Sequence, residues 1–500
     1  MQKLGALDGN FFYTETDKTP NHVSSVQLFE LPKKTNEEQF LSGLKDFYQS
    51  RIHLVPYLTR IPRFVPGNID HPVWVKDKHF DIENHIIRIN MPAPGSFEQL
   101  ELKVAEIHAE LMDRNKPLWQ LFVITGLEDN KIAFYNQAHH ACIDGMAGQA
   151  ATMIMMDTTP DHPTIEKPEA SNKKEEGMAE LFRLSFENLL KFQIDLPSHT
   201  LGSIDASARL TKLALTPGKQ VSKTFRSAPK TRFNRMVGKK RTYAAGDMSV
   251  TELKAMGKAA NCKLNDIFMA VCAGGLRSYM ERSDDLPRRT LKAACPVSLR
   301  KPGDTSMENQ VTMMTVGLAT DIRDPLLRLR SIIDSSLLGK EIVAAVSEGY
   351  NPNVSMFGLP ALITSASKVA EFFNMANVAP TPFNLVISNV PGPRETLYSN
   401  GARMLTHYPV SIPVHSQGLN ITASSYIDSL YFSVTACALA VPDAVRLRDD
   451  IMTAFIELKS LLIPNPNKVT DLQSRQSDIA VEPAPVIEDL DIEDDLKKAS

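Results

Sequence analysis

Short apolar strands and amphipathic helices alternate through the first part of the chain. The stretch HVSSVQLFEL, residues 22–31, has the pattern of a strand, and PVWVKDKHFDIENHIIRI, residues 72–89, that of extended segments. In SFEQLELKVAEIHAELMDR, residues 96–114, apolar positions recur at helical spacing behind an acidic first turn, which predicts a helix. This alternation indicates a mixed α/β domain.

A predicted hairpin and another helix follow in the same part. Residues 115–127, NKPLWQLFVITGL, and residues 131–140, KIAFYNQAHH, read as two strands joined by the polar turn EDNK. Asp144-Gly145 is typical of a turn, and MAGQAATMIMM, residues 146–156, restarts as a helix. The stretch NQAHHACIDGMAG therefore covers a strand end and a tight turn into a helix, where open α/β sheets usually place their chemistry.

A second series of strands and helices begins near Arg241. Residues 249–283 predict two helices with a break at Asn261–Asn265, and residues 325–376 have a mostly helical pattern. Five further segments predict strands: TLKAACPVSLR, NQVTMMTVGL, FNLVISNV, GLNITASSYI and SLYFSVTACA.

Between the two series the composition loosens. Residues 158–177 read as a linker, and an amphipathic helix is predicted near Met178–Phe192. Lys219–Arg241 then holds nine Lys and Arg residues and no acidic residue. This basic strip fits either a solvated crossover loop or a surface for the phosphates of a ligand or of lipid headgroups, and the sequence leaves both open.

Five hundred residues exceed the usual size of one hydrophobic core, so two domains are expected. We predict a first domain at 1–157, a linker and basic segment at 158–240, a second domain at 241–465 and a tail at 466–500. From Asp471 to Ser500 the tail carries nine acidic against three basic residues, which is typical of a disordered segment.

The net charge, the cysteines and the lack of long apolar segments limit the class and the location of the protein. A net charge of −3 gives no general attraction to nucleic acid, and the five scattered cysteines, never spaced CxxC, favour reduced thiols in a cytoplasm. The N-terminus lacks the apolar core of a signal peptide. The longest charge-free windows contain several prolines, so we expect a cytoplasmic protein, attached to a membrane peripherally at most.

His139 and His140 are the first candidates for chemistry. Neighbouring strand residues point to opposite faces, so the two rings cannot readily share one metal ion, and no HExxH motif or Cys/His pair supplies further ligands. No metal is expected. At a strand end, one histidine can instead project into a cleft as a general base while the other packs inward and fixes the turn. Two purely structural histidines remain the alternative from spacing alone.

Five motifs in order resemble the bacterial wax ester synthase/diacylglycerol acyltransferase family, a branch of the CoA-dependent acyltransferases. HHACIDG matches the HHxxxDG motif, and LDGNFFYTETDKTPNHVSSVQLF is similar to the N-terminal segment of the family. Pro117–Trp119 matches its PLW motif, Asn265 and Asp266 its Asn-Asp pair, and Ser388–Pro393 its SNVPGP signature. The family's usual Met and Gly are replaced by Asn21 and Ser24, where contacts with an acyl chain would differ.

The resemblance implies an α/β fold of two chloramphenicol-acetyltransferase-like domains with the active-site channel between them. It implies acyl transfer from a fatty acyl-CoA to a long-chain fatty alcohol or to diacylglycerol, without a cofactor beyond acyl-CoA as co-substrate. The partners would be these lipids and, peripherally, the inner membrane or lipid inclusions, with no nucleic acid. A condensation-type acyltransferase acting on another acceptor and a catalytically idle lipid-binding protein are the alternatives.

The resemblance also assigns site residues. His140 would be the general base, with His139, Asp144 and Gly145 completing the motif. Asp144 would hold the loop, paired with an arginine.

Each of the remaining candidate residues could also have a purely structural role. Asn265 and Asp266 would shape the site or stabilise charge, although Asn or Asp at a helix start is often only a cap. Substrate contacts are expected from six residues of the PLW and SNVPGP motifs: Pro117, Trp119, Ser388, Asn389, Pro391 and Gly392. The alternatives are that the tryptophan belongs to the core and that SNVPGP is a structural turn. Cys142, two residues after His140, could form an acyl-enzyme in principle, but it occupies a variable position of the motif.

Overall fold

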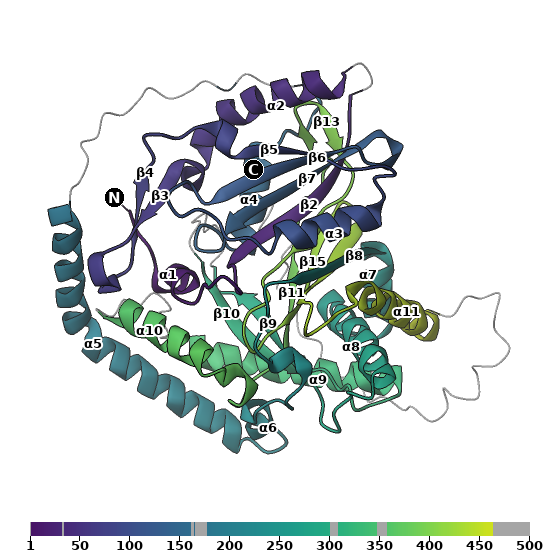
Figure 1. Ribbon diagram of the computed structural model, residues 1–500. Coiled ribbons are helices and arrows are strands. Elements are labelled where there is room, and N and C mark those ends of the chain that lie inside the picture. The colour runs from purple at the N-terminus through teal and green to yellow at the C-terminus, as the bar shows by residue number, and fades with distance from the viewer. Residues whose placement is uncertain are drawn as a thin grey trace.

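The computed structural model describes residues 2–32, 35–161, 165, 178–300, 309–347 and 358–463. The predicted acidic tail and most of the linker at 158–177 lie outside these residues. Figure 1 shows two large sheets with helices packed around them, the upper one built mainly from the purple and blue first half of the chain. The lower sheet is teal to yellow and comes from the second half.

The first large sheet has seven strands in the order β12-β13-β2-β7-β6-β5, with β14 also paired to β2. Its strands are β2 (His22–Glu30), β5 (Ile86–Asn90), β6 (Trp119–Thr125), β7 (Lys131–His139), β12 (Tyr398–Ser399), β13 (Ala402–Met404) and β14 (Tyr408–Val410). The predicted hairpin is confirmed, because β6 and β7 pair antiparallel across the turn. A small separate sheet joins β1 (Gln2–Lys3), β4 (Val73–Lys76) and β3 (Arg60–Arg63).

Three strands of the first sheet come from the second half of the chain. β13 and β14 pair antiparallel with β2, and buried Leu397, Met404 and Val410 join the hydrophobic core of the first half. The sequence analysis placed residues 398–410 in the second domain and predicted no strand there. The division into domains stays a prediction, but the first sheet is completed by residues from the second part.

The second large sheet has the order β10-β9-β11-β15-β16-β8. Its strands are β8 (Arg241–Ser249), β9 (Lys292–Ser298), β10 (Val311–Gly317), β11 (Leu385–Val390), β15 (Leu419–Tyr426) and β16 (Ser429–Cys437). All five strands predicted for this part are present, and β8 was missed because Gly246 and Asp247 interrupt its apolar pattern. β11 runs parallel to both β9 and β15.

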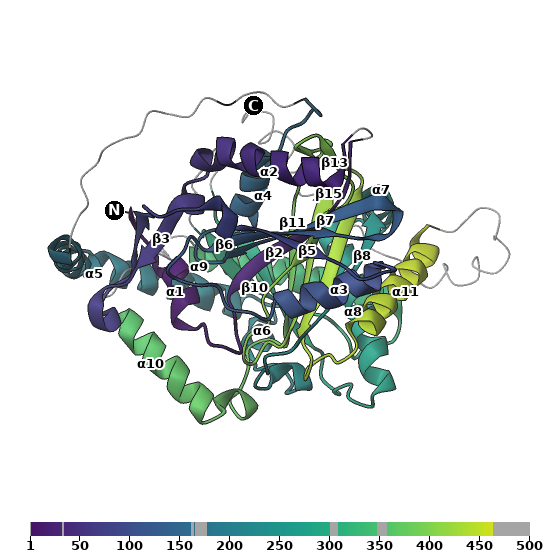
Figure 2. The same cartoon turned by 45° about the horizontal axis from the view of Figure 1, so that its top comes forward.

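Helices pack around the two sheets (Figure 2). They are α1 (Ala6–Tyr13), α2 (Glu37–Arg51), α3 (Phe97–Ile107), α4 (Gly145–Met155), α5 (Met178–Leu215), α6 (Val221–Phe225), α7 (Val250–Ala259), α8 (Leu264–Arg282), α9 (Pro325–Ser347), α10 (Leu359–Phe372) and α11 (Ala444–Leu462). Of these, α5 and α10 lie at one side of the molecule, outside both sheets. The helix predicted near Met178–Phe192 is wrong in length, because α5 continues to Leu215 over a second run of good helix formers.

The basic strip Lys219–Arg241 is largely fastened to the protein. Lys219 pairs with Glu341, Lys230 donates to the carbonyl oxygens of Ala376 and Ala379, and the guanidinium of Arg241 is buried. These contacts favour the structural crossover for most of the strip.

The described residues hold neither a helix that could span a membrane nor a cluster of metal-ligating side chains. None of the helices there has the length and apolar content needed to cross a bilayer. Nor do three or more His, Cys, Asp or Glu side chains in that part of the chain gather as metal ligands would.

Candidate active site

The turn from β7 into α4, residues 139–145, lies against one edge of the second sheet. Arg300 directly follows β9, Asn309 precedes β10, and Val390 ends β11, and each contacts this turn. β9 and β11 are parallel neighbours, so their carboxyl ends meet at the same edge of the sheet. The two histidines therefore lie where the two halves of the molecule meet.

His139 is buried and holds the turn in place. Its Nδ1 accepts a hydrogen bond from the backbone N–H of Ala141 at 3.1 Å, so its Nε2 is the side that faces Glu15 Oε1, at 3.2 Å. The ring stacks on Phe12 with centroids 4.4 Å apart. Burial alone would raise the pKa of Glu15, but hydrogen bonding from His139 and from the N–H of Asn21, with the charge of Arg114 nearby, lowers it to about 2. Glu15 is thus an ionised carboxylate that fixes the tautomer of His139.

His140 is partly buried, and its Nδ1 is a buried nitrogen. Its imidazole stacks on Phe11 at 4.0 Å, with the two planes 9° apart. Among the described residues Nδ1 accepts or donates no hydrogen bond. Burial lowers the pKa of His140 to about 4, against the opposing charge of Asp144. The ring is therefore neutral near pH 7 and able to accept a proton.

Asp144 is buried and structural. Its Oδ1 accepts from the backbone N–H of Ala147 at 2.8 Å and caps α4, while its Oδ2 accepts from the guanidinium of Arg300 at 2.7 Å. The expected arginine partner is thus Arg300. A Cβ on Gly145 would lie 2.9 Å from Cγ2 of Val390, so only glycine lets the second half approach this closely.

Asn309, Asp8 and Asn21 complete the support of His140. Asn309 Nδ2 donates to the carbonyl oxygen of His140 at 3.0 Å, and its backbone N–H donates to Asp8 Oδ1 at 3.1 Å. The N–H of His140 donates to the carbonyl of Asn21 at 2.8 Å. Sequence reasoning did not single out Asn309 or Asp8, because their partners are far away in the chain. Asn21 was noted only as a departure from the family pattern, and the structure makes it a buried hydrogen-bonding centre.

Cys142 is unsuited to nucleophilic attack. The side chain is buried, and burial raises the pKa of its thiol well above the usual range. The thiol therefore stays protonated near pH 7.

Comparisons with known proteins agree across almost the whole chain. Residues 4–268 match the family described as wax ester synthase/diacylglycerol acyltransferase catalytic domain, and residues 307–459 match the C-terminal domain of the same family. The chain belongs to the wax ester synthase/diacylglycerol acyltransferase family.

Individual relatives support this assignment. The chain is 31% identical over 451 residues to the O-acyltransferase WSD of Acinetobacter baylyi, covering 88% of this chain and 93% of the relative. It is 32% identical to a candidate diacylglycerol O-acyltransferase of Mycobacterium tuberculosis, covering 91% and 99%.

Solved structures give the fold. The wax ester synthase/diacylglycerol acyltransferase from Marinobacter aquaeolei VT8 superimposes with a TM-score of 0.65 and 25% identity, covering 92% of this chain and all of that one. The first condensation domain of the CDA synthetase superimposes with a TM-score of 0.56 at 11% identity and shows the shared fold alone. The protein is an acyltransferase with the two-domain α/β fold that the sequence predicted.

The Asn-Asp pair of the family lies at the start of α8. Asn265 Oδ1 accepts from Nδ2 of Asn389, at the end of β11. Asp266 Oδ2 accepts from the backbone N–H of Lys263 at 3.2 Å, which is a capping contact. Its Oδ1 is buried and has no hydrogen-bond partner in the described part of the chain. The structure brings Asn265 and Asn389 together, and their roles toward substrate stay predictions.

The SNVPGP motif forms a tight loop on the β15–β16 hairpin. The N–H of Gly392 donates to Ser425 Oγ at 2.9 Å, and a Cβ on Gly392 would lie only 2.0 Å from the carbonyl oxygen of Ser425. Ser388 pairs with Thr422 across the sheet, and Pro391 is exposed. These contacts support the structural alternative, while the predicted substrate contacts stay untested.

The PLW motif supports the histidine turn from behind. The carbonyl of Leu118 accepts from the N–H of His139 at 2.9 Å, and Pro117 is buried. Trp119 is 2% exposed, stacks on His85 and donates from Nε1 to the carbonyl of Leu58 at 2.9 Å. This placement favours the core alternative for Trp119 over an acyl-tunnel lining.

A cavity of about 380 Å³ borders the site on the side of α1. Phe12, Glu15 and Arg114 line one wall, and Thr364, Ser367 and Lys368 of α10 line another. It reaches the stack that supports His139, and His140 is not among its lining residues.

Proposed function

We propose that this protein transfers a fatty acyl group from acyl-CoA to the hydroxyl group of a long-chain alcohol or of diacylglycerol. His140 is the general base. The observation that carries this assignment is a neutral, partly buried imidazole held between the two halves of the molecule by Asn21 and Asn309.

The proposed reaction needs one proton carrier. As the hydroxyl oxygen attacks the thioester carbon, His140 takes the hydroxyl proton, and a C–O bond forms. The tetrahedral intermediate then collapses, the C–S bond breaks, and His140 returns the proton to the CoA thiolate. A positioned base contributes about 10²–10⁴-fold to the rate. Most of the remaining rate enhancement would come from holding the two substrates together.

The surroundings of His140 suit this role. Its backbone is fixed at both polar groups, because the N–H bonds to Asn21 and the carbonyl accepts from Asn309. His139 faces away from it toward the carboxylate of Glu15, and Asp144 is occupied by Arg300 and the start of α4. His139 and Asp144 are thus occupied, which leaves His140 as the member of the motif to which we assign the base, and direct attack in a ternary complex needs no cofactor beyond acyl-CoA.

The relatives' names supply the substrate classes. The Acinetobacter relative is named an O-acyltransferase, and the Marinobacter protein carries both the wax ester and the diacylglycerol activity in its name. We extend both acceptors to this chain, with wax ester synthesis first and diacylglycerol acylation second. Because both acceptors are lipids, the protein would work at the surface of the inner membrane or of lipid inclusions, from the cytoplasm.

A thiol-release assay tests the reaction. Purified protein is given palmitoyl-CoA with hexadecanol, with diacylglycerol, or with no acceptor, and free CoA is followed with a thiol reagent. We expect acceptor-dependent release, with the ester product identified by mass spectrometry. Absence of release with either acceptor would support an idle lipid binder instead. An acyl-thioester trapped on Cys142 would replace direct attack with a covalent route.

A further inference from the structure

An exposed apolar stripe runs along α10 on the side that faces solvent. Leu362, Ala366, Val369 and Phe373 recur at intervals of four, three and four residues, which places them on one face of the helix. In a helix that packs on a core such a stripe is buried, yet Leu362 is 65%, Val369 55% and Phe373 65% exposed.

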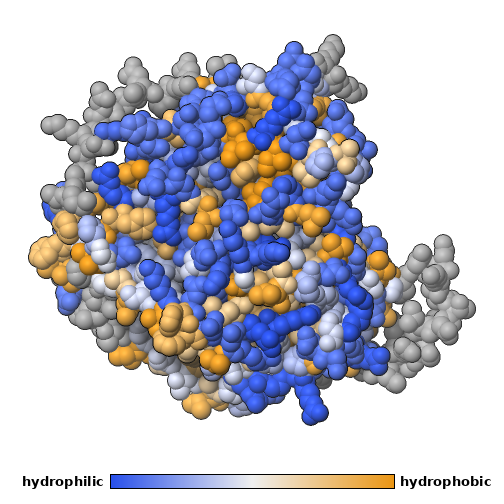
Figure 3. Space-filling view, viewed as in Figure 1, coloured by the Kyte–Doolittle hydropathy of each residue, from blue (hydrophilic) through white to orange (hydrophobic). Residues whose placement is uncertain are grey.

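The apolar surface continues past the end of the helix. Phe372 is 79% exposed and meets Phe373 edge to face with ring centroids 5.1 Å apart. The next short helix, η7 (Met375–Asn377), adds Met375, and Val378 follows it, exposed by 43% and 74%. Figure 3 shows apolar residues gathered at the lower left, over α10, with hydrophilic residues beside them. Contiguous exposed apolar surface of this kind marks an interaction site.

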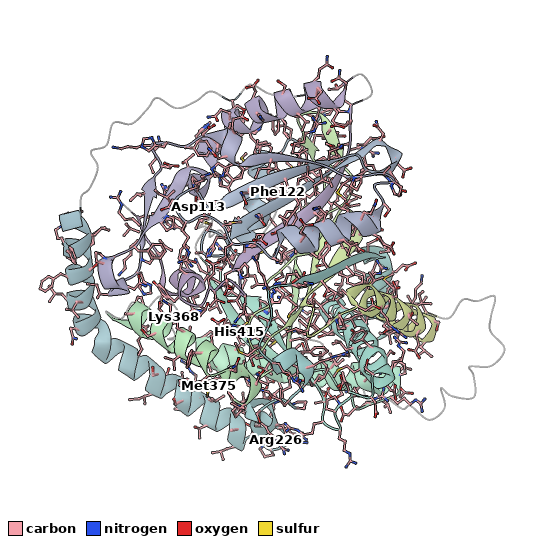
Figure 4. All side chains as sticks on the ribbon, viewed as in Figure 1. Asp113, Phe122, Arg226, Lys368, Met375 and His415 are labelled. Atoms are coloured by element: carbon pink, nitrogen blue, oxygen red, sulfur yellow. The ribbon has the colours of Figure 1, made fainter. Side chains whose placement is uncertain are left out.

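Cationic side chains surround this surface. Lys368 projects from α10 itself, and Lys18 pairs with Glu371 of the same helix at 3.1 Å. Lys230 donates to the carbonyls of Ala376 and Ala379. Figure 4 shows Lys368 and Met375 along the same edge of the molecule.

A fourth cationic side chain, Arg235, lies near Lys230. The pKa of Lys230 is lowered first by burial and then by the charge of Arg235, which is exposed. Lys368 and Lys18 thus lie at α10, and Lys230, with Arg235 near it, lies at the segment that follows the helix. An apolar centre with a basic rim complements an anionic phospholipid surface.

The stripe lies on the solvent side of α10, the helix that also lines the cavity. Thr364, Ser367 and Lys368 line the cavity that reaches Phe12 and Glu15, and they lie on the other side of α10 from the stripe. The helix therefore separates the stripe from this cavity. We propose that the face formed by Leu362, Val369, Phe372, Phe373, Met375 and Val378, here called the α10 face, docks the enzyme on an anionic phospholipid bilayer. This rests on the proposed function, since the acceptor would be drawn from that bilayer.

Vesicle flotation of the full-length protein tests the docking. Vesicles of pure phosphatidylcholine are compared with vesicles of equal parts phosphatidylcholine and phosphatidylglycerol. We expect binding to the mixed vesicles. The double variant Phe372→Asp/Phe373→Asp should lower the partition coefficient by about tenfold or more, because two exposed aromatic rings lose their apolar contact with lipid. Lys368→Glu should lower it about tenfold on mixed vesicles only.

Matched controls come from the opposite side of the molecule. Leu102→Asp on α3 and Ile456→Asp on α11 replace apolar side chains that are 73% and 64% exposed, and Lys254→Glu on α7 reverses an exposed charge. Figure 1 shows α3, α7 and α11 on the side away from α10. These variants should bind mixed vesicles like the parent protein.

Activity separates this proposal from the proposed function. The Phe372→Asp/Phe373→Asp variant should keep its thiol release with butyryl-CoA and dissolved hexanol and lose it with diacylglycerol embedded in mixed vesicles. A parent protein that releases thiol in solution but does not float with mixed vesicles contradicts the docking and leaves the reaction intact. Equal binding by the α10 variants and the controls, or self-association through the α10 face in sedimentation, also overturns it.

Discussion

The imidazole of His140 differs from that of His139 by its surroundings. His139 has Glu15 on one nitrogen and the Ala141 N–H on the other, whereas the ring of His140 keeps Nδ1 unpaired among the described residues. Burial holds the pKa of His140 near 4, below the usual value for histidine. The geometry thus separates a buried histidine that faces a carboxylate from a partly buried one that stacks on Phe11.

The pH dependence of the rate follows from that pKa. The neutral form of His140 is the active base, so activity should be lost as pH falls through about 4 and should be flat through the usual histidine range near 6.5. Initial rates of thiol release recorded before any unfolding measure this profile. An acid limb centred near 6.5 would show that the ring is more solvated in the working enzyme.

Asn309 is expected to matter for the rate. Asn309→Ala removes the side-chain donor to the His140 carbonyl and to the buried Asp8, while the backbone N–H to Asp8 stays. Loss of such a partner costs about 1–3 kcal/mol. We expect kcat to fall about tenfold or more while KM for acyl-CoA changes little. The exposed Asn115→Ala serves as the control. An unchanged kcat for Asn309→Ala would remove Asn309 from the support of His140.

Part of this residue-level arrangement could be predicted from the sequence. Adjacent strand positions point to opposite faces, which predicted that one histidine packs inward and the other outward. The Asp-Gly turn predicted that Asp144 holds the loop. Arg300 and Asn309 could not be found in this way, since they reach the turn from the second half and no local pattern records that contact.

At the scale of elements, periodicity predicted most strands and helices because their apolar positions repeat over several residues. β12, β13 and β14 are two or three residues long and carry no period, so they were missed. The end of α5 was missed for a different reason, because a polar composition was read as a loosened linker.

The SNVPGP loop should be sensitive to a single methyl group. Gly392→Ala places a Cβ 2.0 Å from the carbonyl oxygen of Ser425, so the loop must shift, at a cost of about 1–3 kcal/mol. Chemical denaturation should show this loss of stability. Gly317→Ala on β10 meets its nearest neighbour at 3.5 Å and should be tolerated. Equal stability of the two variants would show that the loop adapts freely.

For the whole molecule, the sequence predicted two α/β domains but not the strands that the second half lends to the first sheet. Such long-range pairing depends on the assembled fold and leaves no local signal. The exchange joins the two halves along the edge of β2 opposite β7, and the histidine turn is fixed by residues from both halves.

The stability of the whole molecule should fall as pH drops from about 6.5 toward 4. Burial lowers the pKa of four buried histidines: His22, His71, His108 and His407. Each is neutral in the folded state and gains a proton on unfolding. Each therefore adds up to about 1.4 kcal/mol per pH unit to the slope of the free energy of unfolding against pH in this window.

The carboxyl group of Glu101 changes the free energy of unfolding with pH in the opposite direction. Burial raises its pKa to about 7, so its contribution is lost as pH rises from 4.5 toward 7. Urea unfolding at several pH values measures the net effect, with the free energy of unfolding expected to rise with pH between 4 and 6.5. A flat or falling profile would contradict the burial of these histidines.

Replacement of His140 by alanine tests the central assignment most directly. In the palmitoyl-CoA and hexadecanol assay, His140→Ala should lower kcat by about 10²–10⁴-fold, while Cys142→Ala keeps most of the activity. Circular dichroism and thermal unfolding confirm that both variants are folded. A folded His140→Ala protein that releases CoA thiol at the parent rate would contradict the account.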